Sequence, residues 1–266
     1  VAAGESVFGA LTRVSTSLEG DLAGEMRRTV ADIGGGMPLE AALTAKRALQ
    51  APRQYLGASA IGEACERRIQ YDYAGAPRDP GKDFEGKTLR IFDRGHSFEE
   101  LARGWLIDAG FDVSSWSERT KQPHGFSQAD GKFRGHVDGV ILSGPDIAGV
   151  GYPCLWEHKA LGGKGARGVE RHGLKKAKPG YYAQVQIYMA YLDLTAHPAI
   201  FTVTNADDAT QNHLLIPFDP EEAQRQTDKA VRIIQATEAG DLLPRGFAAA
   251  DHFECRFCPF SGRCWK

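Results

Sequence analysis

Glu157, His158 and Lys159, with Asp138 upstream, are the residues whose types and spacing point to chemistry. Residues two apart on a β-strand point to the same face, so a strand over residues 155–161 would place Glu157 and Lys159 side by side. A carboxylate can hold a divalent cation, and an ammonium beside it can orient or activate a water. With Asp138 as a second anionic ligand, the set predicts metal-assisted attack on a phosphodiester. A Glu-x-Lys pattern occurs by chance in most proteins of this size, so the weight of the triplet depends on its surroundings.

Asp138 has a second interpretation. Asp138-Gly139 lies between alternating apolar residues, which is also a strong signal for a tight β-hairpin turn. In that case Asp138 would be only a turn residue. Because Glu157 and Lys159 follow, we favour Asp138 as a metal ligand.

A strongly basic stretch follows the predicted metal strand. The chain as a whole has a net charge of −2, but residues 158–178 contain seven Lys or Arg, one acid and many glycines. Most such runs are solvated loops. A flexible cationic loop beside a metal site is also what a phosphate-backbone substrate would require. The predicted nucleic-acid-binding residues are Lys164, Arg167, Arg171, Lys175 and Lys176.

Three of the five cysteines form a C-x2-C-x5-C pattern near the C-terminus, at Cys255, Cys258 and Cys264. Close thiols in a reducing compartment favour a metal site over disulfides. Three thiolates need a fourth to complete a zinc site or a cubane cluster. Cys65 is the better fourth ligand, because strand parity points Cys154 away from Glu157 into the core. From spacing alone, zinc and an iron–sulfur cluster are equally favoured.

The composition describes an ordinary soluble globular protein. The 266 residues are 42% hydrophobic, and the mean hydropathy is −0.35. No apolar stretch is long enough to span a bilayer and no signal-peptide pattern opens the sequence, so we expect no membrane partner and a cytoplasmic location. Helical spacing near the start predicts an N-terminal helical lobe over residues 1–56, followed by one large domain over residues 57–266.

The predicted elements of the large domain alternate between helices and strands. Helices are expected for a segment holding Cys65 and for residues 96–109, 181–194 and 220–239. Strands are expected at 111–116, 132–142, 153–161, 199–204 and 212–218. This order predicts an α/β (α+β) fold with a central mixed sheet flanked by helices.

The order of the motifs resembles the PD-(D/E)xK nucleases, which have a restriction-endonuclease-like core. Within them it resembles the RecB-type and CRISPR-associated four-cysteine exonucleases. The matching segments, in chain order, are Gly95-His96-Ser97-Phe98-Glu99, Gly135-His136-Val137-Asp138, Glu157-His158-Lys159, Gln184-Val185-Gln186-Ile187-Tyr188, and Cys65 with Cys255, Cys258 and Cys264. The resemblance implies that the four cysteines hold an iron–sulfur cluster, with a 4Fe-4S cluster favoured over zinc.

The first-helix ligand departs from the four-cysteine pattern. That position is usually a histidine four residues after a glycine, whereas here the residue four after Gly95 is Glu99. The segment from Gly95 through Glu99 to Arg103 is more similar to the phage recombination exonucleases, in which a glutamate takes this role. His96 lies one turn earlier and shares the helix face, so it remains the rival of Glu99.

The resemblance implies a Mg²⁺- or Mn²⁺-dependent deoxyribonuclease that acts as an exonuclease or processes DNA ends. Asp138, Glu157 and Glu99 (or His96) would bind the metal, with the carbonyl of His158 completing the shell. Lys159 would position the attacking water. The helix that carries Gln184 and Tyr188 would contact the substrate strand or the carboxylates.

The expected partner is DNA, either single-stranded or at duplex ends, in a bacterial or phage-infected cell during recombination or repair. A homo-oligomer or a recombination or CRISPR partner protein is also possible. Two alternatives stand beside this hypothesis. One is a non-catalytic nucleic-acid-binding module with a structural zinc site, and the other is the nuclease subunit of a CRISPR adaptation complex.

Overall fold

The computed structural model describes residues 37–49, 53–118 and 120–266. The chain divides into two compact units, one of Val1–Ala51 with Phe84–Arg90 and the other of Pro52–Asp83 with Ile91–Lys266. In the described part of the first unit, α2 spans Met37–Ala48. The helical spacing predicted near the start of the N-terminal lobe lies outside the described residues.

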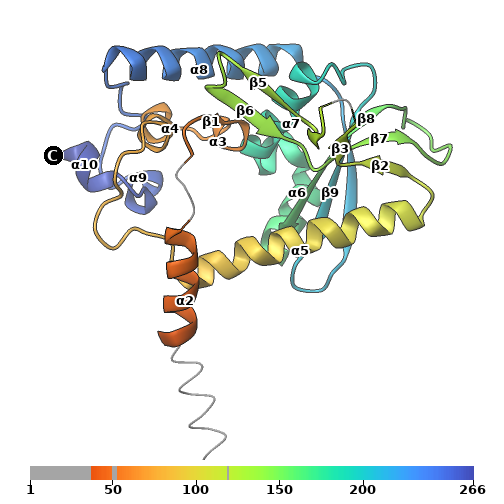
Figure 1. The fold of residues 1–266 in the computed structure, drawn as a ribbon, viewed down its shortest axis with the longest axis horizontal. Coiled ribbons are helices and arrows are strands. Elements are labelled where there is room, and N and C mark those ends of the chain that lie inside the picture. Colours follow the sequence, from red (N-terminus) through yellow and green to blue (C-terminus); the bar gives the residue numbers. More distant parts are fainter. Residues whose placement is uncertain (1–36, 50–52, 119) are drawn as a thin grey trace, which may run out of the picture. The chain divides into compact units, whose positions relative to one another are not determined.

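A five-stranded mixed sheet forms the centre of the second unit, and its strand order is β10-β9-β8-β7-β2. The neighbours β8 and β9 are parallel, and the other pairs are antiparallel. The strands are β2 (Asp112–Ser114), β7 (Gly139–Ser143), β8 (Cys154–Leu161), β9 (Ala199–Asn205) and β10 (Gln211–Ile216). The predicted α/β (α+β) class, with a central mixed sheet flanked by helices, is confirmed (Figure 1).

The two faces of the sheet carry separate apolar cores, as the alternation along β8 requires. Leu155 packs into the core that α6 (Gly163–Ala177) and α7 (Pro179–Tyr191) share with the sheet. Trp156 packs into the other core, which includes Ala102 of α5 (Gly86–Asp108). The helices α6 and α7 thus form the crossover between the parallel strands β8 and β9.

Helix α5 buries fewer of its apolar side chains than an amphipathic helix with this sequence would be expected to bury. Ala102 and Leu106 are buried, but Leu101 and Trp105 are 50% and 42% exposed. The exposed pair lies on a flank of the helix that does not reach the sheet core. By contrast α8, at Pro220–Ala239, has the predicted bounds, because Asp219 caps its first turn and left-handed Gly240 ends it.

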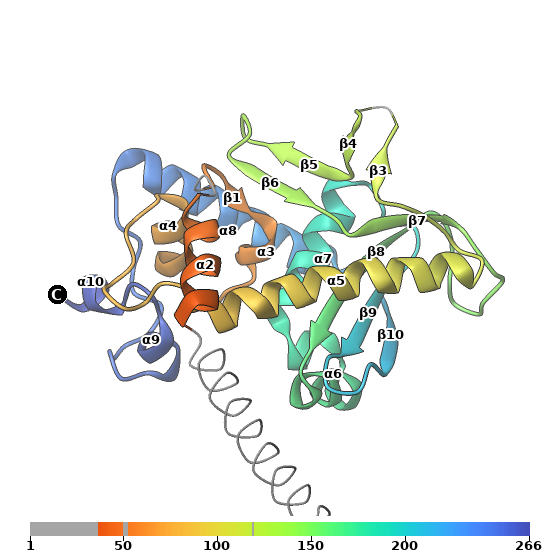
Figure 2. The ribbon, with the colours of Figure 1, turned by 60° about the horizontal axis from the view of Figure 1, so that its bottom comes forward.

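The predicted strand over residues 132–142 is wrong as one element, because the chain changes sheets at Val137 and Asp138. The first half, β6 (Phe133–His136), pairs with β1 (Leu56–Gly57) and β5 (Gly125–Gln128), whereas the second half is β7 of the central sheet. Two short strands, β3 (Trp116–Ser117) and β4 (Gln122–Pro123), pair with each other in a separate two-stranded sheet (Figure 2). Asp138-Gly139 is therefore a junction between sheets, and the hairpin interpretation is wrong.

The predicted flexible basic loop is also wrong, because residues 163–177 form helix α6. Ala166, Val169 and Leu174 bury an apolar side of the segment against the sheet. Tertiary burial of such a face outweighs the helix cost of roughly 1 kcal/mol for each glycine. The helix deviates only at Gly173, where φ is 73°.

Short helices at the chain's C-terminal end lie beside α4 (Glu66–Tyr73), as Figures 1 and 2 show. These are α9 (Phe253–Phe257) and α10 (Ser261–Trp265), and α3 (Ala58–Ile61) precedes α4. Asp79 accepts hydrogen bonds from the amides of Gly262 and Arg263 at the start of α10. Among the described residues, no helix is both long and apolar enough to cross a membrane.

Candidate nuclease and cysteine sites

Asp138 and Glu157 meet where β7 and β8 begin to pair. Gly139 is the register partner of Trp156, so the preceding Asp138 stands opposite Glu157. The His158 amide donates a hydrogen bond of 2.8 Å to Asp138 Oδ2, which holds this carboxylate against β8. The Glu157 side chain is only 1% exposed and that of Asp138 is 15% exposed. Two carboxylates are therefore held together in a site largely withdrawn from solvent.

The Lys159 ammonium lies among the oxygens predicted to bind metal. Its Nζ is 2.5 Å from Glu157 Oε1, 2.8 Å from the carbonyl oxygen of His158 and 3.7 Å from Asp138 Oδ2. Glu157 and Lys159 share a strand face, as their spacing of two predicts. These three oxygens therefore surround one cation, which is the Lys159 ammonium.

Glu99 on α5, the residue predicted to be the third metal ligand, lies within electrostatic reach of Asp138 and Lys159. Burial, and next the Asp138 carboxylate, raise the pKa of Glu99 to about 7, against the opposing charges of Lys159 and His96. His96 Nδ1 lies 3.9 Å from Glu99 Oε2, but the His96 side chain is 80% exposed. The charges of Asp138 and Lys159 therefore act on the Glu99 carboxylate, which favours Glu99 as the third ligand.

The charge balance of this group favours a further cation. Burial, and next the Asp138 carboxylate, raise the pKa of Glu157 to about 8, because three carboxylates share one ammonium. Glu157 Oε2 is buried and has no hydrogen-bond partner among the described residues, which is rare for a buried polar atom. Across the described chain, no three His, Cys, Asp or Glu side chains already stand as a metal site. An orphaned carboxylate oxygen and hard oxygen donors fit Mg²⁺ or Mn²⁺.

Gln184 and Tyr188 reach the carboxylates from α7. Gln184 Nε2 donates to Glu157 Oε1 over 2.7 Å and contacts the Tyr188 hydroxyl at 3.1 Å. Both side chains are buried, and burial raises the pKa of Tyr188, so its hydroxyl stays protonated at neutral pH. The bare backbone of Gly135 admits the tyrosine ring, since a Cβ there would lie 2.4 Å from Tyr188 Cε1.

Tyr181, which the sequence analysis did not assign to the site, lies beside Lys159. The Tyr181 ring centroid is 5.6 Å from Lys159 Nζ, within the range of a cation–π contact. Its spacing of three residues before Gln184 on a helix is the signal that could have found it.

The His158 side chain points away from the carboxylates, as strand parity predicts. Its Nε2 is 2.9 Å from Thr204 Oγ1 on β9. Burial lowers its pKa to about 4, so the imidazole is neutral at physiological pH. His158 therefore serves the site through its backbone, whose amide binds Asp138 and whose carbonyl accepts from Lys159.

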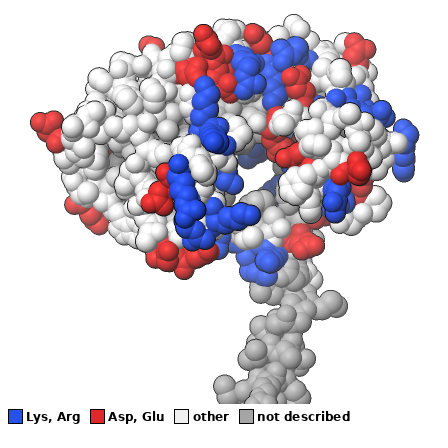
Figure 3. All heavy atoms as spheres, turned by 180° about the vertical axis from the view of Figure 1, so that it is seen from behind, with Lys and Arg blue, Asp and Glu red and all other residues white. Residues whose placement is uncertain are grey.

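The predicted nucleic-acid-binding residues all lie exposed on α6, the helix that directly follows β8. They are Lys164, Arg167, Arg171, Lys175 and Lys176. Lys175 is paired with Asp219 at 2.8 Å. Figure 3 shows one face of the molecule on which Lys and Arg side chains gather toward the middle, with Asp and Glu among them.

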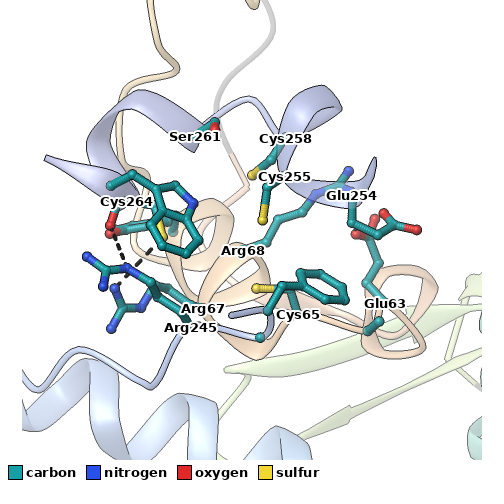
Figure 4. A pocket seen from close by; sticks show the side chains of 15 residues that line it. Glu63, Cys65, Arg67, Arg68, Arg245, Glu254, Cys255, Cys258, Ser261 and Cys264 are labelled. Atoms are coloured by element: carbon teal, nitrogen blue, oxygen red, sulfur yellow. Dashed lines mark hydrogen bonds and ion pairs between the residues drawn. The ribbon is translucent and has the colours of Figure 1, made fainter. Parts of the chain in front are cut away.

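Four cysteines line one pocket, although the chain separates the first from the others by 190 residues. They are Cys65 at the N-terminal cap of α4, Cys255 on α9, Cys258, and Cys264 on α10. Figure 4 shows their side chains around a common space. Gly246 closes one side, where a Cβ would lie 3.0 Å from Cys65 Sγ.

Cys154 takes no part in this pocket. It is fully buried in the sheet core with Trp156, and burial raises the pKa of its thiol to about 11. The four pocket cysteines are not in disulfides. A soft thiolate donor set suits zinc or an iron–sulfur cluster. In the described ranges, however, no group of three or more His, Cys, Asp or Glu side chains stands ready to hold a metal ion, so the thiols are not preassembled as a metal site.

Comparisons with known proteins give weak likenesses. No family model matches the chain, and no curated protein sequence matches it. Among solved structures, an alkaline exonuclease from Laribacter hongkongensis (LHK-Exo) has a TM-score of 0.49 and 17% identity, over 71% of this chain and 90% of that chain. Its complex with dAMP has a TM-score of 0.47 and 17% identity, over 70% and 89%. The structure of SSO0001 has a TM-score of 0.44 and 16% identity, over 88% and 96%. Because these TM-scores are below 0.5, the likenesses assign neither a family nor an activity to this chain.

Proposed function

We propose that this chain is a metal-dependent DNA nuclease of the PD-(D/E)xK type that hydrolyses phosphodiester bonds at DNA ends. One observation carries the proposal. Oxygens of Asp138, Glu157 and the His158 carbonyl converge on the Lys159 ammonium, and the second Glu157 oxygen is buried without a partner. Such a set offers a cation several oxygen ligands and keeps a lysine within reach of a water.

The protein groups have distinct tasks in this proposal. Asp138, Glu157 and Glu99 would hold Mg²⁺ or Mn²⁺ with the His158 carbonyl. When bound, the ion supplies Lewis-acid stabilisation of charge on the phosphate. Lys159 orients the attacking water and stabilises negative charge near it.

The surroundings of Glu157 restrict its motion. Gln184 donates to the carboxylate that Lys159 also contacts, and Tyr188 bonds to Gln184 from the next turn of α7. Because α7 is packed into the core, these bonds orient the carboxylate toward Lys159. Ligands held in one orientation by such neighbours bind metal more tightly.

The substrate in this proposal is DNA, contacted through its phosphates. Exposed cations on α6 follow the catalytic strand directly, and a helical array of Lys and Arg suits a backbone contact that does not read sequence. Lys175 is the weakest of these candidates, since Asp219 already neutralises it.

The pocket of Cys65, Cys255, Cys258 and Cys264 is proposed to hold a 4Fe-4S cluster. Its support is the presence of four cysteines around one pocket. The cluster would clip α4 to the C-terminal helices α9 and α10. Joining segments so distant in sequence is where a clip most reduces the entropy of the unfolded chain.

The nuclease proposal is tested with end-labelled single-stranded and duplex DNA and a covalently closed circle, each with Mn²⁺ and with EDTA. We expect labelled ends to be degraded with Mn²⁺ only and the circle to resist. Asp138→Ala should abolish cleavage, whereas Lys164→Ala on α6 should retain the chemistry and weaken DNA binding. Cleavage that survives in Asp138→Ala at the wild-type rate would refute the site. The pair Glu99→Ala and His96→Ala identifies the third ligand, with loss of Mn²⁺ binding expected only for Glu99→Ala.

A further inference from the structure

The cysteine pocket contains a hydrogen-bond donor that has no acceptor among the described residues. Arg68 lines the pocket, and within this part of the chain its Nε is buried without a hydrogen-bond partner. Its terminal Nη1 is occupied, at 2.8 Å from Glu63 Oε2. A buried N–H that lacks an acceptor is unfavourable and rare, so we expect its acceptor to be a group that binds in the pocket.

Arg68 lies near the cysteines because it is in the first turn of α4, which Cys65 precedes. It is three residues after Cys65, so the two side chains share a face of α4. Figure 4 shows the Arg68 side chain running between Cys65 and the pair Cys255 and Cys258. Its charge also opposes the rise that burial causes in the pKa of the Cys258 thiol.

Three of the thiols already have donors of their own. Arg67 Nη1 donates to Cys264 Sγ over 3.8 Å, the Trp265 side chain donates to Cys255, and the Phe260 amide donates to Cys258 Sγ over 3.5 Å. The Arg68 Nε–H is therefore a donor additional to those that serve these cysteine sulfurs. A zinc ion bound by four thiolates would bring no acceptor beyond them, whereas a 4Fe-4S cluster brings inorganic sulfides.

We propose that Arg68 binds the cysteine-held cluster directly, its Nε–H donating a hydrogen bond to a cluster sulfide. This inference rests on the proposed 4Fe-4S cluster and assigns a residue that belongs to neither the cysteine set nor the nuclease site. Hydrogen bonds to cluster sulfurs stabilise the more negative reduced state, so Arg68 raises the reduction potential and slows cluster loss. Arg68 is thus a cluster-binding residue and takes no part in DNA cleavage.

The test compares Arg68→Lys, Arg68→Gln and the matched control Glu63→Gln in the full chain, purified without oxygen. Arg68→Lys keeps the positive charge and removes the Nε donor, whereas Glu63→Gln removes the ion pair and keeps the donor. The readouts are iron and acid-labile sulfide content, the rate of iron release to a chelator, and the midpoint potential. Circular dichroism reports whether each variant is folded.

We expect both Arg68 variants to release iron roughly 10-fold faster or more, as for other residues that contact bound metal ligands, and to have a more negative midpoint potential. Glu63→Gln should behave as wild type. Iron release and potential unchanged in Arg68→Gln would overturn the inference. So would the same effect in Glu63→Gln, because the ion pair would then explain it.

These measurements distinguish a failure of the Arg68 inference from a failure of the cluster or nuclease proposals. Zinc without iron in the wild-type protein would overturn the cluster and the role of Arg68 together. Iron in the wild-type protein with unchanged Arg68 variants would overturn the role of Arg68 alone. The nuclease proposal is judged separately, by cleavage in the Asp138 variant.

Discussion

Gln184 Nε2 lies 2.7 Å from Glu157 Oε1, so a helix that follows β8 in the chain orients the carboxylate on that strand. The bond is buried, and the same amide contacts the Tyr188 hydroxyl. Glu157 thus takes its orientation from α7 and Lys159, while its second oxygen lacks a partner. Oε1 is therefore fixed by hydrogen bonds, whereas Oε2 is available to bind a metal ion.

Substitution of Gln184 is expected to reduce cleavage without unfolding the protein. Gln184→Met removes the donor to Glu157 and retains side-chain volume, so the loss should be about 10- to 100-fold, as for other residues that orient metal ligands. Gln186, two residues later on α7, is the matched control. It is also buried but bonds to the Pro217 carbonyl and the Asp219 amide. Gln186→Met should lower the denaturant midpoint instead and leave the cleavage rate of the folded fraction near wild type.

Substitution of Lys159 should separate metal binding from chemistry. Lys159→Met removes the ammonium that shares the oxygens of Glu157 and His158, so Mn²⁺ should bind at least as tightly as to the wild type. Cleavage should fall about 10²- to 10⁴-fold, the usual contribution of a positioned acid–base group. Calorimetric titration with Mn²⁺ and single-turnover cleavage measure the two effects. Weaker Mn²⁺ binding together with retained cleavage would contradict the assigned role.

Replacing Gly135 by alanine should destabilise the fold, because the added Cβ would clash with Tyr188. An alanine Cβ there would lie 2.4 Å from Tyr188 Cε1 and 2.8 Å from Phe126 Cε1, in a packed region. Overpacking of this kind costs about 1–3 kcal/mol. Gly104→Ala on α5 is the control, because its Cβ would meet nothing within 4 Å. Urea unfolding should show a loss for Gly135→Ala and a gain of about 0.5–1 kcal/mol for Gly104→Ala.

His158 should make the protein less stable in mild acid. Burial lowers its pKa in the folded state to about 4, below the ordinary value of 6.5. The unfolded chain therefore takes up the proton first, and stability falls as the pH drops from about 6.5 toward 4. Between pH 7 and pH 5 the contribution is about 2 kcal/mol, from 1.36 kcal/mol for each pKa unit. This loss should be smaller in His158→Gln than in the wild type.

The control for this prediction is the exposed His136 on β6. His136→Gln should leave the difference in unfolding free energy between pH 7 and pH 5 as it is in the wild type. An unchanged difference in His158→Gln would show that other groups cause the acid sensitivity.

Features that depend on local backbone geometry could be predicted from residue types and spacing alone. The period of a strand places Glu157 and Lys159 on one face and Trp156 and His158 on the other, whatever the rest of the chain does. Capping residues likewise set both ends of α8. These relationships involve few residues close in sequence, so their types and spacing suffice.

Features that depend on packing between distant segments became visible only in the folded chain. Residues 163–177 are helical because the sheet buries their apolar side, although their glycines favour a loop. The break at Asp138 arises because β6 and β7 pair with different sheets. Cys65 reaches the C-terminal cysteines, and Arg68 the pocket between them, because α4 packs beside that end of the chain. Local propensity cannot report such contacts, because their free energy comes from surfaces that meet only in the folded molecule.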